Sequence, residues 1–89
     1  MNSAGFSSDQ KTRDAVERCL ERICEAAAKL GEQAIELMPN QPWPVIRALG
    51  NRLRHDYDHI RAERLWDIVE VDLPSLEAAC IRAIENLKP

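Results

Sequence analysis

The sequence predicts an all-α protein of the up-and-down antiparallel helical bundle class. Ala, Leu, Glu and Arg, which favour helix, dominate the composition, whereas Val and Thr are sparse. Apolar residues recur at three- and four-residue spacings along most of the chain, as in amphipathic helices. Strand-like alternation and internal repeats are not visible. Three long helical elements and a short one are therefore expected to bury their apolar faces against one another.

The first half of the chain is predicted to hold a flexible N-terminus, residues 1–8, and then a long helix from about 9 to 30. Ser7 and Gln10 have the spacing of a capping box, and Gly31 follows the helix in the position of a C-terminal cap. Residues 32–38 are expected to form a short second helix before Pro39. The apolar stripe of the long helix is Val16, Cys19, Leu20, Ile23, Ala27 and Leu30.

In the second half, three prolines between residues 39 and 44 predict a stiff connector. Pro44 suits the first turn of a helix that extends to about His55. A turn over residues 56–60 and a helix from residue 61 or 62 are expected to follow. Pro74 is predicted to kink or break that last helix, and the apolar stripe continues through Leu76, Cys80, Ile84 and Leu87.

Size and charge limit the possible functions. Eighty-nine residues allow one domain, over residues 9–88, with a thin core that oligomerisation commonly reinforces. The net charge of −3 argues against broad, non-specific binding of nucleic acids, which requires a basic surface. A local basic patch is nevertheless expected, because five arginines crowd into one short region: Arg47, Arg52, Arg54, Arg61 and Arg64.

The cysteines argue against a disulfide framework or a zinc site. There are three of them, an odd number, and none forms a C-x-x-C pair. They are interpreted as small buried apolar residues in a reducing compartment. No apolar run approaches ~18 residues and no signal-peptide pattern is present, so a cytoplasmic protein without a membrane segment is expected.

The side chains best suited to catalysis form a polar strip on the helix that is predicted to end at about His55. Arg47, Asn51 and His55 follow one another at i, i+4 and i+8 and drift only ~80° around the helix, and Arg54 projects within ~20° of Arg47. An imidazole exchanges a proton near neutral pH, and a guanidinium binds phosphate oxygens. Such a set could cleave RNA without a metal, His55 deprotonating a ribose 2′-hydroxyl while arginine holds the phosphate. The alternative interpretation is a solvated helix face.

A metal site is a competing hypothesis for residues 55–59, whose sequence is HDYDH. His55 and His59 have i, i+4 spacing, but no third histidine and no H-E-x-x-H motif accompany them. No metal or other cofactor is therefore expected. Tyr57 has a structural alternative too, in which its ring packs beside Trp66.

Three segments together resemble the HepT-like branch of the HEPN superfamily: KTRDAVERCLERICEAAAKLGEQ, PWPVIRALGNRLRHDYDHI and LWDIVEVDLPSL. The resemblance covers about residues 10–88. It implies an up-and-down bundle that forms a homodimer, with two copies of the motif meeting in a cleft. It also implies a metal-independent ribonuclease toxin, paired with a small nucleotidyltransferase of the MntA type that adds AMP to the motif tyrosine.

Carried over to this chain, the resemblance makes His55 the catalytic histidine, Asn51 the motif asparagine and Tyr57 the AMP acceptor. The usual arginine before the asparagine is replaced by Gly50. Arg47 or Arg54 could supply the missing charge; otherwise the domain is degenerate, a non-catalytic interaction module that pairs with a nucleotidyltransferase. Only about eight residues precede the first matching segment, where the family usually has a long helix, which predicts an apolar groove covered in a dimer or higher oligomer. The alternative is a reading frame that begins further upstream and encodes that helix.

Overall fold

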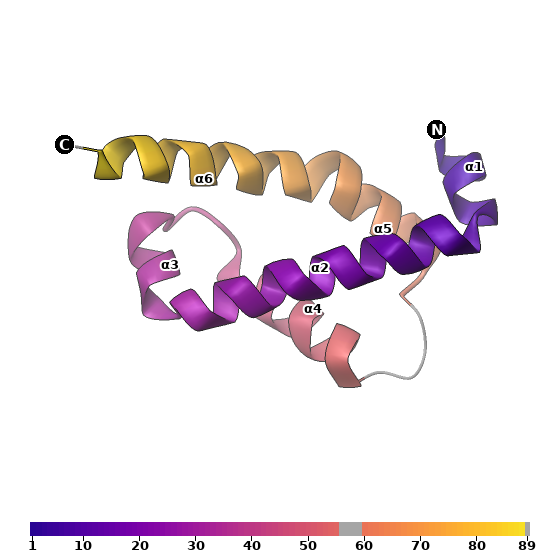
Figure 1. Cartoon of the computed structure of the whole chain (residues 1–89), viewed down its shortest axis with the longest axis horizontal. Coiled ribbons are helices and arrows are strands. Elements are labelled where there is room, and N and C mark those ends of the chain that lie inside the picture. The colour runs from indigo at the N-terminus through magenta and orange to yellow at the C-terminus, as the bar shows by residue number, and fades with distance from the viewer. Residues whose placement is uncertain (56–59, 89) are drawn as a thin grey trace.

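The computed structural model describes residues 1–55 and 60–88, and every regular element in these ranges is helical, which confirms the predicted all-α class (Figure 1). In chain order, the elements are α1 (Ser3–Ser8), α2 (Gln10–Leu30), α3 (Glu32–Leu37), α4 (Trp43–His55), α5 (Ala62–Asp67), the π-helical turn η1 (Ile68–Asp72) and α6 (Leu73–Leu87). No helix within the described residues has the length and apolarity needed to cross a membrane.

The N-terminal segment differs from the loose end expected from the sequence. Asn2 accepts a hydrogen bond from the Gly5 amide and starts α1, and Phe6 is 2% exposed. The Phe6 ring packs against Trp66, with 5.4 Å between the ring centroids. Burial of this aromatic ring holds the first turn of the chain against α5.

Helix α2 begins one residue after Asp9, which caps it in place of the expected Ser7. The Asp9 carboxylate accepts hydrogen bonds from the Thr12 amide, at 3.1 Å, and from the Thr12 hydroxyl. The hydrogen bond from the Thr12 amide is the main reason that the pKa of the Asp9 carboxyl group is lowered. At the other end Gly31, with φ of 55°, closes the helix through its bond to the Ala27 carbonyl, as predicted.

The connector before α4 is fixed by a buried indole. Trp43 Nε1–H donates to the Met38 carbonyl at 2.8 Å, and the ring is 8% exposed. Pro44 lies in the first turn of α4, where its missing N–H costs nothing, as the sequence indicated. The hydrogen bond between the Trp43 indole and the Met38 carbonyl therefore fixes the start of α4 against the connector.

The kink expected at Pro74 takes the form of a π turn. The Leu73 amide bonds to the Ile68 carbonyl, five residues back, and the backbone stays right-handed helical from Asp67 through Leu73. Pro74 stands in the first turn of α6, where its missing amide is tolerated. Helices α5 and α6 are thus joined by a widened turn rather than by a break (Figure 1).

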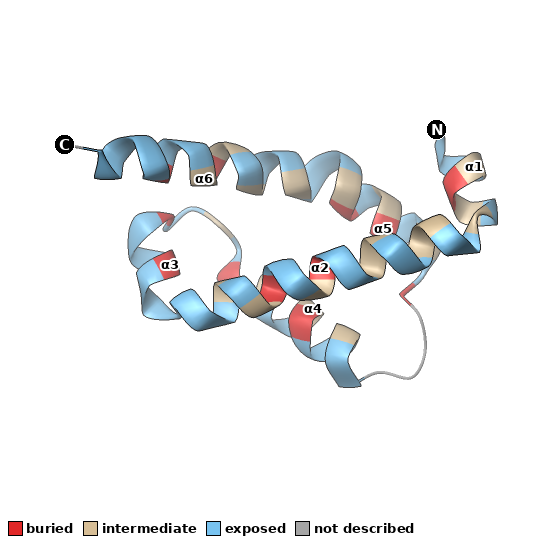
Figure 2. Ribbon diagram, in the orientation of Figure 1, coloured by how far each residue is buried: buried red, intermediate tan, exposed pale blue. Residues whose placement is uncertain are grey.

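Two small apolar clusters hold the helices together. One joins α1, α2, α5 and η1, and its buried members are Phe6, Leu20, Ile60, Leu65 and Ile68. The other joins α3, α4 and α6 through Ala34, Met38, Trp43, Ala79 and Ala83. The buried face of α6 is thus offset from the predicted stripe, because Ile84 and Leu87 are 56% and 66% exposed. Figure 2 shows how much of α6 remains exposed.

Candidate functional site

Helices α2 and α4 come closest at Gly50. A Cβ atom at this position would lie 2.9 Å from the Cβ of Cys24, nearer than such atoms approach in real structures. The Cys24 thiol lies 3.6 Å from the Ile46 carbonyl oxygen and donates to it. Because Gly50 lacks a side chain, the two helices can pack at this separation, and their contact forms the floor of a pocket.

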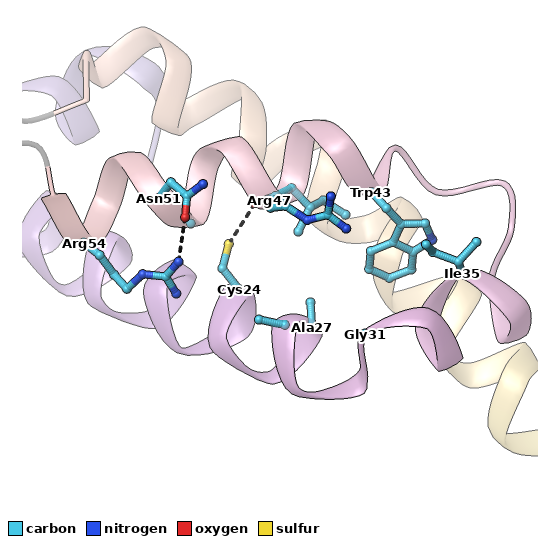
Figure 3. Close-up of a pocket in the computed structure, with 11 residues that line it drawn as sticks. Cys24, Ala27, Gly31, Ile35, Trp43, Arg47, Asn51 and Arg54 are labelled. Carbon is cyan, nitrogen blue, oxygen red and sulfur yellow. Dashed lines mark hydrogen bonds between the residues drawn. The ribbon is translucent and has the colours of Figure 1, made fainter.

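The pocket has a volume of about 280 Å³ and is bounded by α2, α3 and α4. Figure 3 shows Trp43 and Ile35 at one end, Asn51 and Arg54 at the other, and Arg47 between them. Two small residues of α2 and the glycine that caps it complete the walls: Ala27, Ala28 and Gly31. The pocket is therefore apolar at one end and carries guanidinium groups over the rest of its length.

The polar end is positively charged. Arg54 donates to the Asn51 side-chain oxygen at 2.7 Å, which holds this guanidinium along α4. Arg47 forms no ion pair with any residue that the structure describes, and none of the described lining residues is acidic. Two guanidinium groups without an acidic partner among the described residues make the pocket a site for an anion, in a protein whose net charge is −3.

Cys24 forms an apolar, unreactive part of the wall. Burial raises the pKa of its thiol above the usual value, and the nearby Arg54 opposes this only partly. The thiol is therefore protonated at neutral pH, and a protonated thiol is a poor nucleophile. The chemistry that the pocket can support thus depends on the arginines and on groups at its edge.

Comparison with known proteins identifies the family. A family model described as "Ribonuclease HepT-like" matches residues 1–83. The chain belongs to this family.

Curated relatives of this HepT-like chain include archaeal proteins. It is 41% identical over 70 residues to "Putative RNase MJ0127" of Methanocaldococcus jannaschii, a match that covers 79% of this chain and 58% of that protein. It is 36% identical over 72 residues to "Probable ribonuclease HepT" of Thermococcus cleftensis, covering 81% and 66% of the two chains. These matches span less than two thirds of either relative. No solved structure matches the chain.

The structure brings together three of the predicted site residues of this HepT-like chain. Arg47, Asn51 and Arg54 all line the pocket. His55 is the last residue of α4 and is exposed, but it is not part of the lining. One residue adds 100° on a helix, so His55 points well away from Arg54 although it follows directly in sequence.

Two predictions fall on residues 56–59, which lie outside the described residues. They are the AMP-acceptor role of Tyr57 and the competing metal site with His59. In the ranges that the structure does describe, no group of three His, Cys, Asp or Glu side chains is placed to hold a metal ion.

The apolar half of the pocket was not identified from the sequence. Its signal is a row of small residues on α2, Cys24, Ala27, Ala28 and Gly31, at three- and four-residue spacing. Small residues on one helix face allow a close neighbour or leave a hollow beside it. The sequence alone did not reveal that α4 would pack against this row at Gly50.

Proposed function

We propose that this protein is a metal-independent endoribonuclease toxin of the HepT class, acting in the cytoplasm as one half of a type VII-style toxin–antitoxin pair. The observation that carries the proposal is the pair of guanidinium groups, Arg47 and Arg54, in a pocket beside the helix that ends in His55. Arginine guanidinium groups bind phosphate oxygens through paired hydrogen bonds, and RNA, the substrate expected of a ribonuclease family, carries a phosphate at every linkage.

In the proposed reaction His55 takes the proton of a ribose 2′-hydroxyl. The 2′-oxygen then attacks the adjacent phosphorus, the bond from phosphorus to the 5′-oxygen breaks, and the leaving oxygen takes up a proton. The products are a 2′,3′-cyclic phosphate and a 5′-hydroxyl. Arg47 and Arg54 hold the phosphate and stabilise its added charge, and Asn51 positions Arg54 through their hydrogen bond.

A second copy of the chain completes the site in this proposal. His55 lies outside the pocket of its own chain, on an exposed face at the C-terminal end of α4. Apposition of two such faces in a homodimer, or within a higher oligomer, would bring two histidines and two sets of arginines into one cleft. It would also bury apolar surface that a chain of this size leaves exposed.

We assign the control of this activity to a partner, a nucleotidyltransferase antitoxin of the MntA type. It would transfer AMP from ATP to Tyr57: the phenolic oxygen bonds to the α-phosphorus, pyrophosphate leaves and the phenolic proton passes to a base. The added phosphodiester is anionic and would compete with RNA for the arginines of the cleft.

The proposal is tested by incubating RNA in excess EDTA with the wild type, with His55→Ala and with Arg22→Ala. Arg22 is an exposed arginine of α2 outside the pocket and serves as the matched control. Cleavage by the wild type and the control, ending in 2′,3′-cyclic phosphates, and its loss in His55→Ala are the expected results. Equal cleavage by all three proteins would remove His55 from the mechanism.

A second candidate function is a non-catalytic module that binds the nucleotidyltransferase. It is favoured by Gly50, which is buried where the family motif usually has an arginine. Intact RNA after incubation with the pure protein, together with a stable complex with the nucleotidyltransferase, would support this function over catalysis.

A further inference from the structure

The apolar end of the pocket has no role in the cleavage chemistry, and it opens directly beside the arginines. Ala27 of α2 lies near Trp43 of α4 and Ile35 of α3 at this end (Figure 3), and Ala28 also lines the pocket. The indole N–H of Trp43 is already bonded to the Met38 carbonyl. This end therefore offers apolar walls and no free side-chain donor among its described residues.

The pocket is longer than a single phosphate requires. From Trp43 to Arg54, α4 rises by roughly 16 Å, with Arg47 about 6 Å along that span. Its volume of about 280 Å³ lies near the lower end of the range for small-molecule sites. A ligand that fills it needs an anionic part for the guanidinium groups and a flat apolar part for the far end.

We propose that the end formed by Ala27, Ala28, Ile35 and Trp43 is a subsite for one unpaired nucleobase of the RNA whose phosphates Arg47 and Arg54 hold. This inference rests on the proposed function and adds a selection to it. A base in a duplex is stacked and paired and cannot enter such a pocket, whereas an unpaired base can be turned outward into it. The subsite therefore selects single-stranded RNA.

The walls also determine what kind of selectivity the subsite has. Since the described residues at this end present no free side-chain donor or acceptor, the base is held by shape and apolar contact, and the planar guanidinium of Arg47 is available to stack on it. Hydrogen-bond discrimination between the four bases is consequently weak. The subsite therefore distinguishes a nucleotide that carries a base from an abasic nucleotide.

Binding measurements can test the subsite separately from catalysis. The His55→Ala variant of this chain is expected to leave the RNA intact, so fluorescence anisotropy can compare a short single-stranded RNA with an abasic strand that has the same phosphates. The ordinary strand is expected to bind about five- to 150-fold more tightly, the range for one base held against an apolar wall. A duplex of the same sequence is expected to bind as weakly as the abasic strand.

A matched pair of variants locates the effect. In the same background, Ala28→Leu fills the apolar end and should remove the preference for the ordinary strand, while leaving abasic binding unchanged. Ala26→Leu makes the same change at an exposed α2 position outside the pocket and should retain the preference. Equal affinity for the two strands, or an equal loss of both in Ala28→Leu, would overturn the subsite.

Substitution of the two arginines tests the proposed phosphate binding independently of the base subsite. Arg47→Ala with Arg54→Ala should weaken ordinary and abasic strands alike, because both carry phosphates. If that double variant binds both strands as the parent does, the phosphate role fails. If it weakens both but the parent shows no preference for a base, the phosphate role stands and the base subsite is refuted.

Discussion

Gly50 provides the most quantitative prediction, because the structure gives the contact that a side chain there would make. In Gly50→Ala the new Cβ would lie 2.9 Å from the Cβ of Cys24. That atom is attached to the α2 backbone and cannot rotate away, so the two helices must separate by several tenths of an ångström. Overpacking of this kind costs about 1–3 kcal/mol, whereas alanine gains about 1 kcal/mol over glycine in a helix.

The expected net result is a free energy of unfolding lowered by about 1 kcal/mol, measured by urea denaturation followed by circular dichroism. Ala48→Gly, at an exposed position of the same helix, measures the propensity difference in this protein. Adding Cys24→Gly to Gly50→Ala removes the opposing Cβ, so the double-mutant cycle should give a favourable coupling of about 1 kcal/mol or more. Stabilisation by Gly50→Ala alone, with no coupling, would refute the close approach of α2 and α4.

Three further predictions concern other described contacts. Trp43→Phe removes the donor to the buried Met38 carbonyl and should lower the free energy of unfolding by about 1–3 kcal/mol in urea titrations, whereas an unchanged midpoint would contradict the bond's structural role. The buried Cys24, whose pKa is raised, should react with iodoacetamide more slowly than the exposed Cys19 at pH 8, and equal rates before denaturant is added would contradict its burial. Asp9→Ala should lower the urea midpoint at pH 7. Since the folded-state pKa of Asp9 is lowered, this difference is complete above its ordinary value of 3.8 and shrinks as the pH falls through the folded-state pKa, so a difference that grows on acidification would contradict the cap.

Local periodicity predicted most of the helices but not how they pack against one another. Gly31 as the C-terminal cap of α2 and Pro44 in the first turn of α4 depend on neighbours within one or two turns, and the structure confirms both. The α1 helix was missed because its stability comes from Phe6 packing on Trp66, a residue far along the chain. The spacing of apolar residues also could not predict the form of the kink before Pro74, since a π turn differs from an α turn by only one residue.

The candidate site was predicted in part for the same reason. Arg47, Asn51 and Arg54 share a face because α4 is regular, so their grouping follows from helix geometry alone. The pocket that they line depends on Gly50 meeting Cys24, a contact between helices that spacing within one helix does not reveal. The strip drifts by ~80° from Arg47 to His55, and the structure leaves His55 outside the lining.

The phosphate-holding role of the guanidinium groups of Arg47 and Arg54 is the central claim, and single-turnover cleavage of a short single-stranded RNA in excess EDTA tests it most directly. Loss of one stabilising donor typically slows such chemistry by about 10²–10³-fold. The double variant Arg47→Ala with Arg54→Ala should therefore be slower than the wild type by at least about 100-fold, while Arg22→Ala keeps the wild-type rate. Cleavage by the double variant at the wild-type rate would contradict the account.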